Sequence, residues 1–183
     1  MNDLDIRIAL FTVCIHKAFA GVALGDGVSL RQSIVIDGFG EGYTDEEFEQ
    51  LKFAEVIDDW TQIPKNELME AEYTAHLDAA GFRYYIPALM LILVENYDSG
   101  SMRDISTLQS LYPKPDRLWF HYMDKYSLLN YEQKQAIAKY LIALPDLVTL
   151  DTEDKARVER AIRNYWSEFL PIYIPTKVEL KSI

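Results

Sequence analysis

Apolar residues recur every three or four positions over long stretches of the chain, which is the spacing of one face of an α-helix. The first stretch runs from residue 4 to about residue 22 and carries two apolar ridges. One ridge contains Phe11 and Ile15, and the other contains Leu10 and Val13. A helix that is apolar on two faces is normally buried. The sequence therefore predicts a first helix near the middle of the domain.

Two later stretches also have helical periodicity. From residue 82 to about residue 97, apolar residues occupy nearly every side of the predicted helix, which indicates burial. Pro87 fits within the first turn and a half of that helix or marks its true start. The last helix, capped by Asp151 or Thr152, has an apolar line formed by Val158, Ile162, Tyr165, Trp166 and Phe169. We expect Trp166 to be a core residue.

Capping residues mark the starts of other helices. Ser29 can cap a short helix that ends near Asp37, although residues 34–36 fit a brief strand equally well. Thr44 and Glu47 have the spacing of a capping box, in which each side chain bonds the other residue's amide. The helix that follows is expected to end near Trp60.

Further helices are predicted by the same signals in the second half of the chain. Asn130-x-x-Gln133 is a second capping-box pattern, and Pro145 is expected to follow the helix that it starts. Pro64 suits the first turn of a short helix. Residues 98–118 are broken by glycine and proline, with room for one or two helical turns.

Together these elements predict an all-α fold, an irregular bundle of about six to eight helices. We expect a single helical domain over residues 1–170 and an extended C-terminal tail over residues 171–183. The alternation in Val178-Glu-Leu-Lys leaves a minor, short β-pairing near this tail as an open alternative.

Charge narrows the classes of partner. The chain has 183 residues and a formal net charge of −11, which disfavours nucleic acids and anionic membranes. A basic protein or a cationic small molecule is the partner that such a surface attracts, although acidity that serves only solubility is an open alternative. The aromatic residues and the tail also leave a homo-oligomer open.

Cysteine content and the N-terminus indicate a compartment. The one cysteine, Cys14, cannot form an internal disulfide, which favours a reducing environment. The first residues are acidic where a secretory signal would be basic. The longest apolar run, residues 86–94, is far shorter than the roughly 20 residues that span a bilayer. We therefore expect a soluble cytoplasmic protein.

The sequence contains few residues in the patterns that catalytic or metal-binding sites require. The three histidines are scattered, and no His-Glu-x-x-His zinc pattern is present. Glu72 and His76 share a helical face at best, which indicates a local hydrogen-bonded pair rather than a metal site. Cys14 lies on an apolar helix, where a buried thiol is expected. We expect no metal and no cofactor.

Polar residues do gather at two predicted helix junctions. Asp58, Asp59 and Trp60 close one helix, and Arg83, Tyr84 and Tyr85 follow the start of another. These six residues are the candidate ligand-binding site. The favoured interpretation is a buried arginine–aspartate bridge that clamps two helices. The alternative is a polar pocket in which the guanidinium receives an anion.

The same stretch resembles a known family. Gly81-Phe-Arg-Tyr-Tyr-Ile-Pro-Ala88, with Asp59-Trp60 before it, is similar to a family of uncharacterised bacterial proteins typified by Gly-Phe-Arg-Phe-Tyr-Leu-Pro-Ala. The resemblance covers about residues 13–166. It implies a single domain, draws attention to Trp60 and Arg83, and brings no established activity.

Two functions remain open on this basis. The leading hypothesis is a non-enzymatic binding or regulatory protein that acts on a basic or small-molecule partner. The alternative is a small hydrolase or transferase with a polar pocket around Asp58, Asp59, Arg83 and Tyr84. An enzyme requires Arg83 in a pocket beside an unpaired carboxylate. A binding protein requires these groups to be mutually satisfied, with an exposed acidic or aromatic patch elsewhere.

Overall fold

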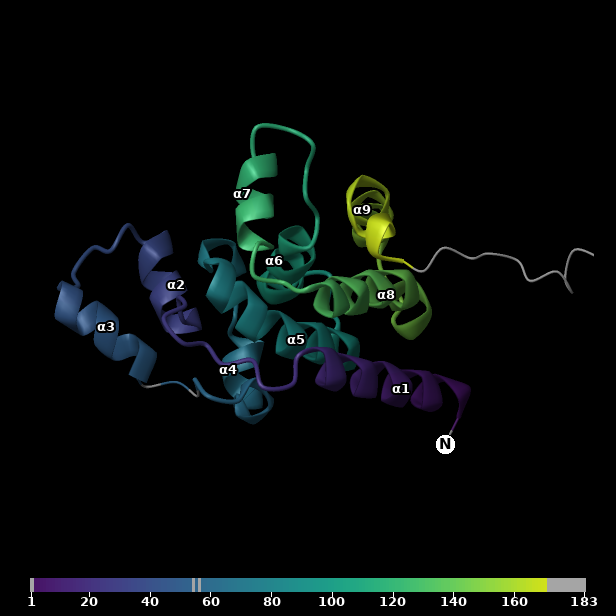
Figure 1. The fold of residues 1–183 in the computed structure, drawn as a ribbon, viewed down its shortest axis with the longest axis horizontal. Coiled ribbons are helices and arrows are strands. Elements are labelled where there is room, and N and C mark those ends of the chain that lie inside the picture. The colour runs from purple at the N-terminus through teal and green to yellow at the C-terminus, as the bar shows by residue number, and fades with distance from the viewer. Residues whose placement is uncertain (1, 54, 56, 171–183) are drawn as a thin grey trace, which may run out of the picture.

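A computed structural model describes residues 2–53, 55 and 57–170, and Figure 1 shows the fold. This part of the chain forms nine α-helices and three short 3₁₀ helices, and it contains no strand. The elements are α1 (Asp3–Ala18), α2 (Leu30–Asp37), α3 (Asp45–Phe53), η1 (Trp60–Gln62), α4 (Lys65–Met69), η2 (Thr74–His76), α5 (Ala79–Asn96), α6 (Met102–Ser110), α7 (Trp119–Lys125), α8 (Tyr131–Leu147), α9 (Thr152–Asn164) and η3 (Trp166–Phe169). The all-α prediction is confirmed, with one helix more than the expected range. The predicted tail, and with it the β-pairing alternative, lies outside the described residues.

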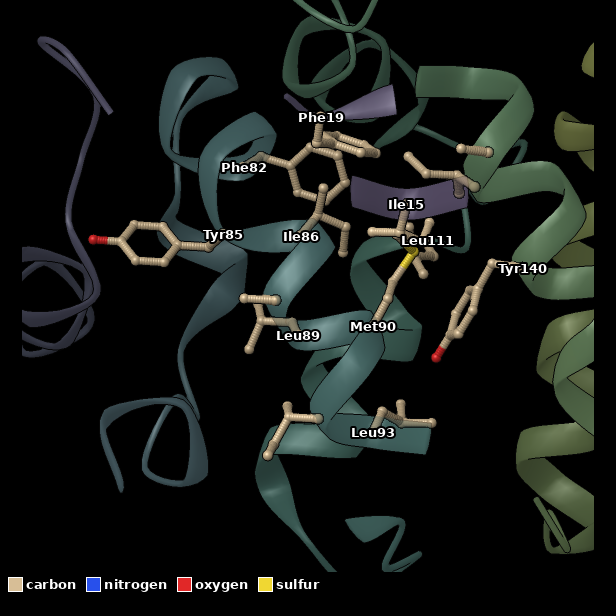
Figure 2. Close-up of a cluster of buried hydrophobic side chains, with 14 of the residues drawn as sticks. Ile15, Phe19, Phe82, Tyr85, Ile86, Leu89, Met90, Leu93, Leu111 and Tyr140 are labelled. Carbon is tan, nitrogen blue, oxygen red and sulfur yellow. The ribbon is translucent and has the colours of Figure 1, made fainter. Parts of the chain in front are cut away.

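The central element is α5, which packs against α1, α4, α6, α7 and α8 (Figure 1). It begins at Ala79, earlier than predicted, because Asp78 accepts a hydrogen bond from the Gly81 amide at 2.8 Å. Pro87 is therefore the ninth residue of α5 and lies beyond its first turn and a half. Figure 2 shows the buried cluster around this helix, with Tyr85 and Tyr140 on opposite sides of it.

The first helix lies at the edge of the molecule, so the expectation of a central position was wrong (Figure 1). Phe11 and Ile15 are buried against α5 and α8, as the first ridge predicted. On the second ridge, however, Leu10 is 67% exposed and Val13 is 66% exposed. One apolar face of α1 is thus left uncovered within the described part of the chain.

Local capping signals placed α2 and α3. Ser29 accepts from the Gln32 amide and starts α2, so residues 34–36 are helical and the strand alternative was wrong. Thr44 and Glu47 form the predicted reciprocal bonds, 2.9 and 3.3 Å long. Helix α3 ends at Phe53, well before Trp60, and buries none of its residues. It stands at the end of the molecule beside α2 (Figure 1).

The C-terminal half covers the other side of α5. Asn130 and Gln133 form the predicted capping box of α8, which continues through Pro145 instead of ending before it. Helix α9 ends at Asn164, and Trp166 begins η3. The Trp166 side chain is fully buried and donates to the carbonyl of Leu111 at 2.7 Å. Its predicted place in the core is confirmed.

Candidate functional site

Asp58 and Asp59 lie in the exposed turn that precedes η1. The Asp59 carboxylate caps this helix, because its Oδ1 accepts from the Thr61 amide at 3.0 Å and from the Thr61 hydroxyl at 2.7 Å. These hydrogen bonds favour the charged form and lower the pKa of Asp59 below its ordinary value. Asp59 thus serves the local turn, and Asp58 lies exposed beside it.

Trp60 anchors η1 to the chain that follows α1. Its side chain is buried, and its indole N–H donates to the carbonyl of Phe19 at 2.9 Å. The ring of His16 packs on it with centroids 4.9 Å apart. Trp60 also lines a cavity of about 230 Å³ whose wall includes His16 and Leu91. Trp60 therefore contributes to a cavity between α1, η1 and α5.

Arg83 does not form the expected bridge to Asp58 or Asp59. Its Nε donates instead to Gln133 Oε1 at 3.2 Å. The same oxygen accepts from the Asn130 amide at 3.1 Å, so Arg83 supports the capping box of α8. Successive helical residues point about 100° apart, so Arg83 faces α8 while the two tyrosines after it face elsewhere. The predicted arginine–aspartate clamp was therefore wrong. Arg83 does join two helices, α5 and α8, but its partner is Gln133.

Tyr84 and Tyr85 are fully buried and touch edge to face, with ring centroids 4.8 Å apart. Burial raises the pKa of Tyr84, and the nearby charges of Asp59, Asp58 and Glu55 raise it further. Tyr84 therefore does lie in the field of both predicted aspartates. Its environment stabilises the neutral phenol, which disfavours a phenolate at this position.

The hydroxyl of Tyr85 leads to a residue that the sequence did not single out, Glu55. Tyr85 donates to Glu55 Oε2 at 2.5 Å, and the Arg31 amide donates to the other carboxylate oxygen at 2.7 Å. The Arg31 guanidinium lies 3.9 Å from that oxygen, and the Glu55 side chain is only 2% exposed. Burial and the charge of Glu55 raise the pKa of Tyr85 well above its ordinary range.

Glu55 lies in the wall of a pocket of about 170 Å³ between α2 and α4, which we call the acidic pocket. Arg31 and Glu67 face each other across it with a separation of 3.5 Å between Nη2 and Oε1. The remaining lining residues are Leu30, Ser33, Ile34, Asn66, Glu70, Ala71, Glu72 and Tyr73. Four carboxylates and one guanidinium thus line the pocket, which carries an excess of negative charge.

The carboxylates of Glu70 and Glu72 are the ones in this pocket without a partner in the described part of the chain. Both residues are exposed at the mouth, just after α4. Glu55 and Glu67, in contrast, are held by Arg31. The pocket therefore combines a fixed inner carboxylate with two outer ones that are available to a cation.

The chain matches the model of a family of unknown function, DUF6714, over residues 10–170. The chain belongs to this family. No curated protein and no solved structure matches it. The DUF6714 match contains the whole acidic pocket, the six candidate residues and the Gly81-Phe-Arg stretch.

Close packing explains why position 81 of that stretch is a glycine. A Cβ on Gly81 would collide with the carbonyl oxygen of Val28, and it would also lie 3.0 Å from Asp78 Oδ1. Asp78 caps α5 and accepts from the Val28 amide at 3.0 Å as well. The chain before α2 therefore packs directly on the first turn of α5. In this DUF6714 protein, Gly81 serves backbone packing.

Neither a metal-binding cluster nor a membrane-spanning helix is found among the described residues. No group of three or more His, Cys, Asp or Glu side chains there could hold a metal ion. His76 lies 2.9 Å from Asp37, not beside Glu72 as the local-pair interpretation expected. Within residues 2–53, 55 and 57–170, no helix is both long and apolar enough to cross a bilayer.

Proposed function

We propose that this protein is a non-enzymatic binding protein whose acidic pocket receives a cationic side chain of a basic partner protein. The observation that carries the proposal is the pair of exposed, unpartnered carboxylates, Glu70 and Glu72, at the mouth of a pocket that already holds Glu55. A lysine or arginine side chain supplies the complementary charge.

The surroundings of Glu55 favour binding over chemistry. Its carboxylate accepts hydrogen bonds from Tyr85 and from the Arg31 amide, so its position is fixed before a partner arrives. A fixed charge reduces the ordering that a partner must impose, which favours affinity. The Tyr85 phenol is held neutral by its environment, so it suits donation of a hydrogen bond better than attack on a substrate.

The rest of the predicted site also favours the binding hypothesis over the enzyme hypothesis. An enzyme there requires Arg83 beside a carboxylate that can move a proton. Asp59 is engaged with Thr61, and Arg83 is engaged with Gln133. These two groups are engaged by other residues and not by each other, so the arrangement that the enzyme hypothesis requires is not present at Arg83.

Long-range charge complements the pocket. The net charge of −11 attracts a basic protein from a distance and raises the rate of encounter. Because the attraction is between exposed groups, it should weaken as salt shortens the screening length to about 10 Å at 0.1 M. The single cysteine suits a reducing cytoplasm, so we propose that the protein meets its basic partner there. We propose that this binding is regulatory.

The proposal is tested by titrating a short oligo-arginine peptide into the native protein and following the heat of binding. The double variant Glu70→Gln/Glu72→Gln should bind about five- to thirtyfold more weakly, as expected for the loss of two exposed charge pairs. The matched control is Glu159→Gln/Glu168→Gln, which removes the same charge from exposed, unpartnered positions on α9 and η3. Equal weakening in both double variants would show general attraction to an acidic surface and would refute the pocket.

A further inference from the structure

Another pocket, lined by basic residues, lies between η2, α6 and α7. Its volume is about 290 Å³, and three of its lining residues, His76, His121 and Lys125, are basic. We call it the basic pocket. The other lining residues are Ala75, Ser106, Gln109, Ser110, Leu118 and Tyr122. A gathering of basic groups in a chain with a net charge of −11 is the reverse of the surface as a whole.

Lys125 is the buried group of this pocket, with 4% of its surface exposed. Its ammonium donates to the carbonyls of Thr74 and Ala75, at 3.1 and 2.8 Å. An ammonium has three N–H donors, so one is not used by these carbonyls, and the ring centroid of Phe82 lies 6.0 Å from Nζ. No carboxylate of the described residues forms an ion pair with Lys125.

A buried charge without a counterion is costly, and Lys125 carries that cost. Burial lowers its pKa to about 8, and the charge of Asp78 opposes the shift. Asp78 forms no ion pair with Lys125, and its Oδ1 accepts from the amides of Val28 and Gly81. An anion that entered the pocket would supply the missing counterion.

The two histidines add ring nitrogens that can form hydrogen bonds with a ligand. Burial lowers the pKa of His121, and the charges of Lys125 and His76 lower it further, while Asp124 opposes them. The His121 ring makes no hydrogen bond with any described residue, so both its nitrogens are available to a ligand. His76 already lies 2.9 Å from Asp37, which fixes it at the rim.

We propose that the basic pocket binds a small organic carboxylate, with the carboxylate against Lys125 and His121 and an apolar body against Leu118 and Tyr122. A cavity of about 150 Å³ is enough to hold a benzene ring, so a pocket of about 290 Å³ has room for a ring with a carboxylate. This site is separate from the acidic pocket, and its ligand does not depend on the basic protein partner.

Benzoate and its neutral analogue benzamide test the proposal by titration at about pH 6.5, followed in amide ¹H–¹⁵N spectra. Benzoate should bind and shift the signals of residues around Lys125, while benzamide should bind at least about tenfold more weakly because it has no charge. Equal binding of the two compounds, or no binding of benzoate at tens of millimolar, would overturn the proposal.

Variants locate the ligand. Lys125→Met keeps an unbranched side chain, one atom shorter and without charge, and should weaken benzoate binding about tenfold or more. His121→Gln alters an exposed position and should weaken binding severalfold, which keeps the test decisive if Lys125→Met fails to fold. Lys155→Met, on exposed surface of α9, is the control and should bind as the native protein does. Unchanged affinity in both pocket variants would refute the site.

An independent observation concerns the uncovered face of α1. Asp3, Ile6, Leu10, Val13 and Lys17 follow one another at spacings of three and four residues, so they form one line along the helix. All five are exposed, and the three apolar ones are 41%, 67% and 66% exposed in chain order. We call this line the α1 stripe. A contiguous apolar line of this kind is typical of a helix–helix interface.

The charges at the ends of the α1 stripe make it self-complementary. Asp3 and Lys17 each lie seven residues from Leu10, in opposite directions. When two copies pair antiparallel about an axis beside Leu10, Asp3 of each copy meets Lys17 of the other. Symmetric pairs of this kind are what a two-fold interface requires, because the same patch serves on both subunits. A parallel pairing would place like charges together.

We infer that a second copy of this chain covers the α1 stripe in a weak, antiparallel dimer. Arg7, on the flank of the stripe, is already bound to Asp146 of α8 at 2.8 Å, which holds α1 in place for pairing. The opposite charges at the two ends select a second copy over a partner whose interface carries one sign of charge. Burial of the apolar centre of the stripe stabilises the dimer, and the charges at its two ends favour the antiparallel orientation of the helices.

A charge-exchange experiment tests the dimer by sedimentation over a range of concentrations. Lys17→Asp alone and Asp3→Lys alone each place like charges at both ends of the interface, so each variant should be monomeric. An equimolar mixture of the two restores both opposite-charge pairs and should dimerise as the native protein does. Lys155→Asp is the control. A native protein that stays monomeric into the millimolar range, or a mixture that stays monomeric while the native protein dimerises, would overturn the inference.

Discussion

Tyr85 of α5 donates its phenolic hydrogen to Glu55, a carboxylate from the segment between α3 and η1, at an oxygen–oxygen distance of 2.5 Å. Through this bond the central helix fixes the innermost charge of the acidic pocket. Glu55 in turn accepts from the Arg31 amide at the start of α2. One buried carboxylate thus joins three segments that are far apart in the sequence, and its position sets the shape of the pocket.

The Tyr85–Glu55 bond can be removed with little change of shape. Tyr85→Phe leaves Glu55 buried and short of one donor, so the free energy of unfolding should fall by about 1–3 kcal/mol. Urea denaturation followed by circular dichroism measures this change. Tyr131→Phe is the matched control, since Tyr131 is 57% exposed and makes no hydrogen bond through its hydroxyl in the described structure. An equal, small effect for both variants would show that the buried bond contributes little.

Gly81 is predicted to tolerate no side chain. Gly81→Ala brings a Cβ against the carbonyl oxygen of Val28, so either α5 or the chain before α2 must shift. We expect a loss of about 1–3 kcal/mol, the usual cost of overpacking a close contact. Gly38→Ala is the comparison, because its nearest atom would lie 3.6 Å from the new Cβ, an ordinary contact. If thermal unfolding finds both variants as stable as the native protein, the close packing of these segments is not rigid.

Trp166 is predicted to be one of the largest contributors to the core. It is fully buried, and its ring lies 5.0 Å from that of Tyr126. Trp166→Ala removes this contact and leaves a cavity, which should lower the free energy of unfolding by about 3–5 kcal/mol. Phe120→Ala, at an 82% exposed position, should change the denaturation midpoint very little. An unchanged midpoint for Trp166→Ala would contradict its place in the core.

The buried Lys125 predicts a pH dependence of stability. Its pKa is about 8 in the folded protein, against an ordinary value of 10.5. Between these values the unfolded chain binds more protons, so the Lys125 contribution to stability increases as the pH rises. From about pH 7 to about pH 9.5, the native protein should gain about 2 kcal/mol relative to Lys125→Met. Denaturant titrations of both proteins at the two pH values measure the difference, and parallel pH profiles would contradict it.

Local structure could be predicted from the sequence because its causes are local. Ser29, Thr44 and Asn130 each cap a helix by bonding a residue three positions ahead, and the sequence displays that spacing directly. The position of α1 could not be predicted in this way. Periodicity identified two apolar ridges, but only tertiary packing decides that Phe11 is covered while Leu10 is not.

The candidate site shows the same limit. Asp58, Asp59 and Arg83 suggested a bridge because they lie at two helix junctions, yet Arg83 turns to Gln133 of α8. Glu55, the buried carboxylate of the acidic pocket, is held by partners from two other segments, and local patterns do not predict such contacts. The sequence did contain one signal. In the predicted helix that ends near Trp60, Glu55 falls on the line of Phe48 and Leu51, so a carboxylate stands where apolar residues are expected.

Charged pairs that are adjacent in sequence can also mislead. Arg103 and Asp104 would ordinarily be read as solvated surface residues, but both are buried, at 2% and 0% exposure. Arg103 binds the Asp104 carboxylate through two nitrogens, at 2.7 and 2.8 Å, and also binds the Asn96 carbonyl. Only the arrangement of α5 and α6 creates this enclosed, fully bonded ion pair.

Whether the acidic pocket receives a cationic side chain can be determined by mapping where a basic peptide binds. Hydrogen exchange of the native protein, measured with and without a short oligo-arginine peptide, reports the contact surface segment by segment. If the pocket is the binding site, exchange should slow at the start of α2, around Arg31, and over residues 66–73, which include most of α4 and the chain after it, with no change in α9. Protection spread evenly over the acidic surface, or confined to segments outside the acidic pocket, would contradict it.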